Sequence, residues 1–82
     1  MIKINIEGYE LEFEKEYVER YEEAVGDSFK DSAQMYLLAD FEEMSIDEIF
    51  CNHTREEIME VIMKATIDEM RFFSGELFKN KK

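Results

Sequence analysis

The sequence predicts a single α+β domain over residues 1–82, in which an N-terminal two-stranded antiparallel hairpin packs against three or four helices. Three observations predict this fold. Apolar and polar residues alternate over residues 2–13 on either side of a Glu-Gly pair. From residue 15 onward, apolar residues recur with a helical period between capping residues, and no proline interrupts them. The chain has 82 residues, 45% of them hydrophobic, which suffices for one core but not for two domains.

The hairpin comprises residues 2–13 and turns at Glu7-Gly8. Gly8 supplies the positive φ that a two-residue turn needs. On the outer face this register sets Lys3 opposite Glu12, which predicts a favourable charge pair. Two strands alone are marginally stable, so helices must cover the apolar face. That face holds three cross-strand pairs, namely Ile2 with Phe13, Ile4 with Leu11, and Ile6 with Tyr9.

Two helices are predicted next, over residues 15–25 and 28–44. Gly26 suits the left-handed conformation that ends many helices. Asp27 or Ser28 is expected to cap the second helix with its side chain. The second helix carries a broad apolar stripe, which we expect to place it at the centre of the fold: Phe29, Ala33, Met35, Tyr36, Leu37, Leu38, Phe41 and Met44.

Two capping boxes, Ser45-Ile-Asp-Glu48 and Thr54-Arg-Glu-Glu57, predict the starts of two further helices. These helices are expected over about residues 46–51 and 55–73. Ser74-Gly75 is expected to break or kink the last one. The last helix has apolar residues on more sides than the core of a small domain covers.

The charge of the chain is strongly acidic and unevenly distributed. The formal net charge is −11. Residues 1–50 contain 15 acidic and 4 basic side chains, whereas residues 51–82 contain 6 of each. Such a field repels nucleic acid and anionic lipid and attracts basic surfaces, so direct nucleic-acid binding is not expected. A single cysteine, no membrane-length apolar run and no signal segment predict a cytoplasmic protein that does not bind membranes.

The chain offers no convincing catalytic or metal-binding constellation. Cys51 and His53 are two residues apart on a predicted turn, where side chains rarely aim at one substrate atom. We interpret Cys51 as a small buried hydrophobe and His53 as a turn residue. The ligand spacings typical of zinc and calcium sites are missing. We therefore expect neither an enzyme nor a resident metal or cofactor.

Exposed carboxylates are the candidate partner-binding groups. Along one face of a strand they recur about every 6.6 Å, and the acidity continues onto the following helix. One interpretation is a solvated surface that only gives solubility, since charge alone lacks specificity. The functional interpretation is that the carboxylates imitate a nucleic-acid backbone and occupy a basic groove of a partner. The candidates are Glu10, Glu12, Glu14, Glu19, Glu23, Glu42, Glu43, Asp47 and Glu48.

A second candidate contact is apolar. Met59, Met63, Met70 and Phe73 lie on a side of the 55–73 helix next to the one that the core would use. Flexible thioethers suit contacts between proteins. These residues either join the core or contact a second subunit or a partner.

In size, charge and order of elements, the chain resembles the small acidic inhibitors encoded by bacteriophages and mobile elements, of which the anti-CRISPR proteins are the best-known group. The resemblance extends over the whole chain but includes no shared motif, so no functional residue is carried across. It implies a protein that covers a nucleic-acid-binding surface of an effector. The opening segment, residues 1–13, is also similar to the start of some small phage tail-assembly proteins.

Two functional hypotheses follow. The leading one is a protein-binding inhibitor of a basic, nucleic-acid-binding host defence protein, such as a CRISPR effector, in the cytoplasm of a bacterial host. The alternative is a phage structural or tail-assembly protein that acts as a homodimer through the 55–73 helix.

Overall fold

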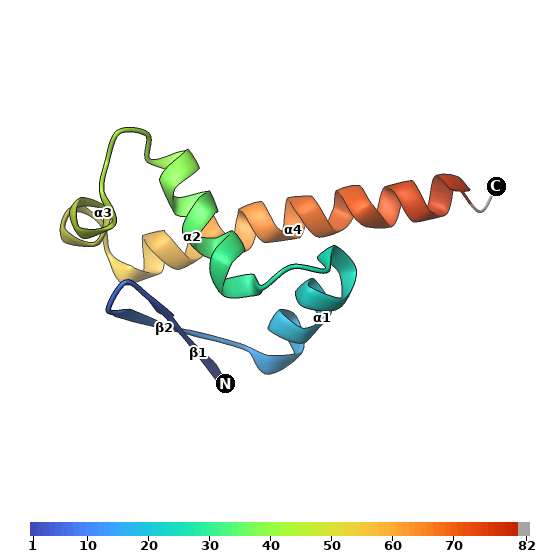
Figure 1. The fold of residues 1–82 in the computed structure, drawn as a ribbon, viewed down its shortest axis with the longest axis horizontal. Helices are drawn as coiled ribbons and strands as arrows, with labels where there is room; N and C mark the ends of the chain where they lie inside the picture. Colours follow the sequence, from blue (N-terminus) through green and yellow to red (C-terminus); the bar gives the residue numbers. More distant parts are fainter. Residues whose placement is uncertain (81–82) are drawn as a thin grey trace.

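The computed structural model describes the backbone of residues 1–80 and the side chains of residues 1–72. Figure 1 shows α4 as a long rod, with the other elements gathered along its N-terminal half. The predicted α+β architecture is confirmed. The elements are β1 (Ile2–Ile6), β2 (Tyr9–Phe13), α1 (Lys15–Val25), α2 (Phe29–Asp40), α3 (Ile46–Asn52) and α4 (Arg55–Asn80).

The hairpin has the predicted register, with Ile2 opposite Phe13 and Ile6 opposite Tyr9. Glu7 and Gly8 both have positive φ, 46° and 93°, as a tight two-residue hairpin turn requires. The Gly8 amide donates a hydrogen bond to Asn5 Oδ1 at 3.0 Å, which further stabilises the turn. Lys3 lies opposite Glu12 as expected, but its ammonium approaches the diagonal Glu10 instead, with Nζ 4.0 Å from Oε1.

Helix α1 has the predicted bounds and ends at Gly26, whose φ is 87° and whose amide donates to the Glu22 carbonyl. Ser28, one of the two predicted caps, occupies the N-cap position of α2, but its side chain makes no capping hydrogen bond. Instead, the Glu22 carboxylate accepts from the Phe29 amide at 3.1 Å, so a residue of α1 caps α2.

Helix α2 ends at Asp40, four residues before the predicted end at 44. Glu43 has a φ of 65°, which is incompatible with a continuing right-handed helix. Phe41 and Met44 continue the apolar spacing because both pack against the core from this turn. The spacing of Phe41 and Met44 in the sequence therefore matched that of one more turn of α2, although neither residue is in the helix.

Both capping boxes form. Ser45 Oγ accepts from the Glu48 amide at the start of α3, and Thr54 Oγ1 accepts from the Glu57 amide at the start of α4. The helix predicted over 46–51 ends one residue later, at Asn52. The predicted end at 73 is wrong, since α4 runs through Ser74-Gly75 to Asn80. Serine and glycine lower helix propensity but do not forbid a helix.

Phe29 is the centre of the hydrophobic core and is fully buried. Its ring meets the rings of Phe13, Tyr17 and Tyr21 edge-on, with centroids 4.9, 5.6 and 5.4 Å apart. These rings come from β2, α1 and α2, so one aromatic cluster joins the hairpin to two helices.

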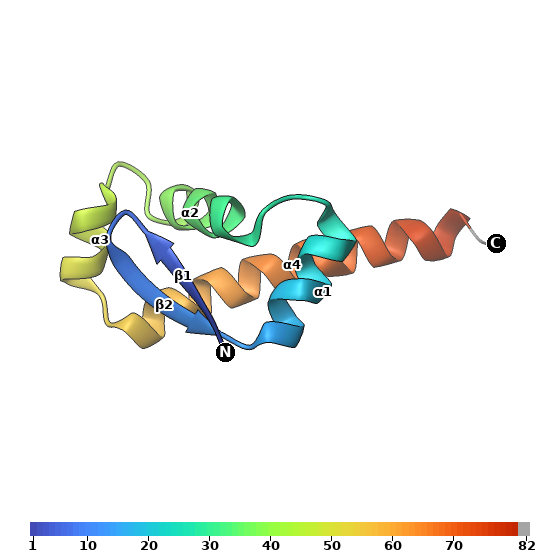
Figure 2. The same cartoon turned by 60° about the horizontal axis from the view of Figure 1, so that its bottom comes forward.

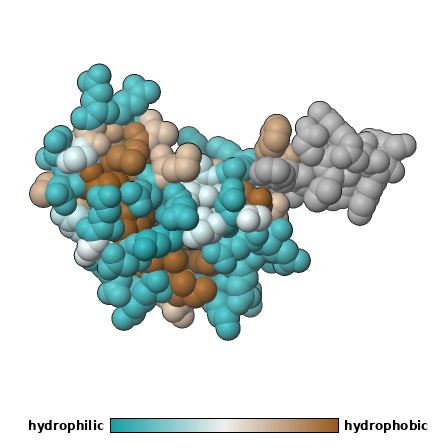
Figure 3. All heavy atoms as spheres, viewed as in Figure 1, coloured by the Kyte–Doolittle hydropathy of each residue, from teal (hydrophilic) through white to brown (hydrophobic). Residues whose placement is uncertain are grey.

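Helix α2 contacts β1, α1, α3 and α4, which confirms its central position. Figure 2 shows α2 above the hairpin and α4 passing behind it. Met35 and Leu38, expected to widen the buried stripe of α2, are instead exposed at 69% and 42%. Figure 3 shows that hydrophilic side chains cover most of this face, with hydrophobic surface between them from α2 and α3 down to the N-terminus.

Candidate protein-binding surface

The nine candidate carboxylates all lie at the surface. Glu10 and Glu12 lie on the outer face of β2, and Glu14 follows just before α1. Lys3 approaches Glu10, but both side chains are more than half exposed, so solvent screens the pair. Within residues 1–72, no lysine or arginine lies within 4.0 Å of the carboxylates of Glu12 and Glu14. Among the described side chains, Glu12 and Glu14 at the end of β2 therefore form no close ion pair.

Asp47 comes close to the hairpin through a long-range contact. The Tyr9 hydroxyl donates to Asp47 Oδ1 at 3.0 Å, and the Tyr9 ring stacks on Phe50 at 4.1 Å. The hydrogen bond to Asp47, together with burial, raises the pKa of Tyr9. These contacts place Asp47 and the first turn of α3 beside the start of β2, which neither residue's sequence position predicts.

The other candidates lie farther apart. Glu19 is on α1, 3.8 Å from Lys15, and Glu23 is one turn later. Glu42 and Glu43 lie in the connection between α2 and α3, which is at the opposite end of the folded body from α1 in both views (Figures 1 and 2). The nine carboxylates therefore do not form one compact patch, but Glu12 and Glu14 lie beside an apolar surface formed with α4.

That apolar surface is a shallow groove beside α4. A hollow of about 870 Å³ lies on the outward side of α4, and two hollows of about 280 Å³ lie between α4 and the end of β2 and between α4 and α1. Met63 lines all three, so the hollows adjoin one another at this side chain. We call the three together the methionine groove and define it by Met59, Met63, Ile67 and Met70 of α4 with Phe13 and Tyr17.

Three of the four predicted apolar contact residues line this groove. Met59 and Met70 are half-buried against the core, whereas Met63 is 37% exposed. Met59 and Met70 thus lie at the margin of the core, and Met63 is open to solvent; a contact of these methionines with a second subunit or a partner stays a prediction. The side chain of Phe73 lies outside the described residues.

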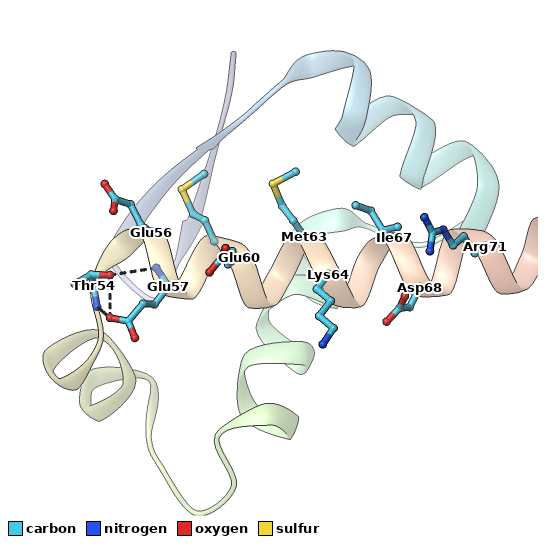
Figure 4. A pocket seen from close by; sticks show the side chains of 10 residues that line it. Thr54, Glu56, Glu57, Glu60, Met63, Lys64, Ile67, Asp68 and Arg71 are labelled. Atoms are coloured by element: carbon cyan, nitrogen blue, oxygen red, sulfur yellow. Dashed lines mark hydrogen bonds between the residues drawn. The ribbon is translucent and has the colours of Figure 1, made fainter.

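Figure 4 shows how the outward side of α4 is arranged. Met63, Ile67 and Arg71 follow one another along the edge that faces the hairpin and α1, and Lys64 and Asp68 lie along the other edge. Glu56 and Glu60 lie near the N-terminal end of the groove (Figure 4). The apolar side chains are therefore enclosed by charged ones.

Tyr17 fixes α1 against α4. Its hydroxyl donates to the Met63 carbonyl at 3.4 Å, and the buried Thr66 hydroxyl donates to the same carbonyl at 3.0 Å. Burial raises the pKa of Tyr17 to about 12. The Tyr17 phenol therefore stays neutral at physiological pH.

A second polar contact ties the same two helices together. The Tyr21 hydroxyl lies 3.0 Å from the Tyr36 hydroxyl and donates to Glu69 Oε2 at 3.2 Å. Burial raises the pKa of Tyr21, and the Glu69 carboxylate adds to the effect. The groove is thus a preformed feature of the fold, since two hydrogen bonds hold α1 against α4.

The rim of the groove is predominantly acidic. Glu57 is held by its capping box, because Oε1 accepts from the Thr54 amide and hydroxyl at 3.2 and 3.0 Å. These hydrogen bonds lower the pKa of Glu57 and keep it ionised. The lining has seven acidic side chains, Glu12, Glu14, Glu16, Glu56, Glu57, Glu60 and Asp68, against three basic ones, Arg20, Lys64 and Arg71.

Sequence reasoning missed part of this site. It identified Met59, Met63 and Met70 from their helical spacing, but it gave neither Tyr17 nor Ile67 a role in this site. The signal for Ile67 was its place between Met63 and Met70 on one helix stripe. No local signal joins Tyr17 to Met63, because the two are 46 residues apart in sequence.

Cys51 and His53 do not form a site. Cys51 is exposed on α3, so its interpretation as a buried hydrophobe is wrong. The His53 ring packs on Phe41 at 4.4 Å, and its Nδ1 lies 3.1 Å from the Ile49 carbonyl oxygen. Among the described residues, no three histidine, cysteine, aspartate or glutamate side chains are grouped to hold a metal ion.

Within the part of the chain that the structure describes, no helix is both long and apolar enough to cross a membrane. No family model, curated protein or solved structure matches this chain. The resemblance to phage inhibitors therefore stays a prediction, and the site is argued from its own geometry.

Proposed function

We propose that this protein is a protein-binding inhibitor, which acts by placing exposed carboxylates on a basic, nucleic-acid-binding surface of a host defence protein such as a CRISPR effector. The observation that carries the proposal is that Glu12 and Glu14, at the end of β2, form no close ion pair among the described side chains and lie directly beside an apolar groove. A partner with cations and an apolar side chain would engage both features at once.

The size of the net charge supports the same proposal. Small domains are usually kept soluble by a net charge of magnitude about 2–8, and this chain has −11. Like charges on a compact fold repel one another and reduce its stability. A basic partner relieves that repulsion, and complementary charge also accelerates and orients the encounter.

Charge and apolar contact have different tasks in this proposal. Exposed ion pairs contribute little free energy each, so carboxylates alone give steering and register rather than tight binding. Most of the affinity of protein interfaces comes from a few buried apolar or aromatic anchors. Met63 and Met59 are in reach of Glu12 and Glu14 because all four line the same hollow.

The experiment is a displacement assay. Purified nucleic-acid-binding defence proteins, including CRISPR effectors, are loaded with fluorescent nucleic acid, and this protein is titrated into each complex. We expect displacement from at least one complex at about one equivalent, weakening steeply as salt is raised. If ten equivalents displace nucleic acid from none of them, the proposed function is wrong.

Two charge-reversal variants of equal net charge locate the contact. Reversing Glu10, Glu12 and Glu14 to lysine is expected to abolish displacement. Reversing Asp40, Glu42 and Glu43, at the α2–α3 connection, is the matched control and should preserve it. Circular dichroism establishes that both variants fold. If the two triples behave alike, the position of the charge is irrelevant and imitation of a nucleic-acid backbone at β2 is contradicted.

The alternative function has its own supporting observation. The half-exposed Met63 and the rod-like extension of α4 past the folded body suit a homodimer of a phage structural or tail-assembly protein. Light scattering separates the two functions. A stable dimer that Met59→Lys with Met63→Lys dissociates, together with no displacement of nucleic acid, favours assembly over inhibition.

A further inference from the structure

We propose that the methionine groove receives a basic amphipathic helix of the partner protein. This inference rests on the proposed function and extends it, because it names the element of the partner that binds and the chemistry of that element. It is carried by the juxtaposition of an apolar floor on α4, a wall formed by the end of β2 and by α1, and an acidic rim.

The shape of the groove suits a helix. Its floor follows α4 from Glu56 to Arg71, which is about 22 Å at a rise of 1.5 Å per residue. A helix of four turns has the same length. Helices that bind in grooves present apolar anchors with i, i+3, i+4 and i+7 spacing, and the floor offers Met59, Met63, Ile67 and Met70 at matching intervals of four, four and three residues.

The side chains of the floor suit an apolar helix face. Methionine is unbranched and polarizable, so it adapts to anchors of different shape. Met63 is exposed enough to be covered by a partner, while Met59 and Met70 already pack against the core and need little ordering on binding. The wall is also preformed, since the Tyr17 hydroxyl of α1 donates a hydrogen bond to the Met63 carbonyl of α4.

The charge of the rim selects the occupant. Seven acidic side chains line the groove against three basic ones, so lysine and arginine at the edges of an incoming helix meet more carboxylates than cations. Glu12, Glu14 and Glu16 lie on the side of β2 and α1, and Glu56 and Glu60 lie on α4. A second copy of this chain is disfavoured because each copy has a net charge of −11.

The test uses three synthetic helical peptides of 18 residues and isothermal titration calorimetry. The first has leucine at i, i+3, i+4 and i+7 positions and lysine elsewhere. The second has the same composition with leucines scattered around the helix, and the third replaces lysine by glutamate. We expect the first peptide to bind with one-to-one stoichiometry and at least tenfold more tightly than the other two. Equal binding of the first two peptides would reduce the contact to unspecific charge attraction and overturn the inference.

Variants of the protein place the peptide. Met63→Glu is expected to weaken binding of the basic amphipathic peptide at least tenfold, although it adds a negative charge. Met35→Glu is the matched control, because Met35 is an exposed methionine on α2 and the charge change is identical. Glu12→Gln with Glu14→Gln should weaken binding a few-fold and flatten its salt dependence. If Met63→Glu and Met35→Glu bind equally well, the groove is not the site.

The outcomes separate this inference from the proposed function. If the Met63→Glu variant still displaces nucleic acid, the groove is not the binding site, but the proposed inhibitor function stands. If the peptide binds in the groove but the protein displaces nucleic acid from no complex, the proposed inhibitor function is wrong and the groove remains a binding site. A dimer that Met63→Glu dissociates and that excludes the peptide identifies a second copy as the occupant and contradicts the inference.

Discussion

The aromatic cluster around Phe29 allows a quantitative prediction about stability. Replacing a core phenylalanine by alanine costs about 3–5 kcal/mol of unfolding free energy, because apolar surface is lost and a cavity remains. A domain of this length is stable by only about 4–12 kcal/mol at 0.05–0.15 kcal/mol per residue. Phe29→Ala is therefore expected to remove a large share of the total stability.

Phe29→Leu gives a more measurable form of the same prediction. Leucine keeps much of the volume but loses the edge-on contacts with Phe13, Tyr17 and Tyr21, each worth about 0.5–1.5 kcal/mol beyond burial. Allowing for partial repacking, we expect a loss of about 1.5–3 kcal/mol. With a urea dependence of about 1 kcal/mol per molar, the midpoint falls by about 1.5–3 M.

The assay is urea unfolding followed by far-UV circular dichroism, with Met35→Ala as the control. Met35 is 69% exposed, so its truncation should change the unfolding free energy by less than about 0.5 kcal/mol. If Phe29→Leu and Met35→Ala have the same midpoint, Phe29 is not the centre of the core and the packing described above is wrong.

Three further predictions concern the cap, the tyrosines and the turn. Thr54→Ala removes the hydrogen bonds to Glu57 and should cost about 1 kcal/mol in urea unfolding; an unchanged midpoint would show that the capping box is unimportant. The pKa of Tyr17 is about 12 in the folded state and 10.0 ordinarily, so the unfolded chain loses this proton first and the folded state should lose stability as pH rises from 10 to 12. Tyr17→Phe should lessen this loss of stability at alkaline pH. If the melting temperatures of the two proteins depend on pH in the same way, Tyr17 is not the group responsible. Glu7 has a φ of 46°, a conformation that glycine adopts without strain. Glu7→Gly should therefore raise the melting temperature, by an amount that corresponds to about 0.4–1 kcal/mol of unfolding free energy. A lower melting temperature would contradict the turn geometry.

The hairpin register and the starts of α3 and α4 were predicted correctly from local sequence patterns. The alternation around Glu7-Gly8 determined the hairpin register, because a shift of one residue would expose every apolar side chain. The capping boxes at Ser45 and Thr54 predicted the starts of α3 and α4, because each cap hydrogen-bonds to a residue three positions later. Each of these features is decided by residues within a few positions of one another.

Features that depend on tertiary packing were predicted less well. The apolar spacing of Phe41 and Met44 imitated a longer α2, although they pack from a turn. The cap of α2 comes from Glu22 of the preceding helix, and the groove exists only because Tyr17 meets Met63 from far along the chain. The sequence thus indicated which carboxylates and methionines were candidates, but not which of them lie together.

The most direct test of partner binding follows the methionine methyl groups by NMR. The chain has six methionines, and selective ¹³C labelling of their methyl groups reports on each during titration with the basic amphipathic peptide. We expect the resonances of Met59, Met63 and Met70 to shift to a common saturation point, while that of Met35 on α2 stays in place. Shifts that are largest at Met35, or absent from all three groove methionines, would contradict binding in the groove.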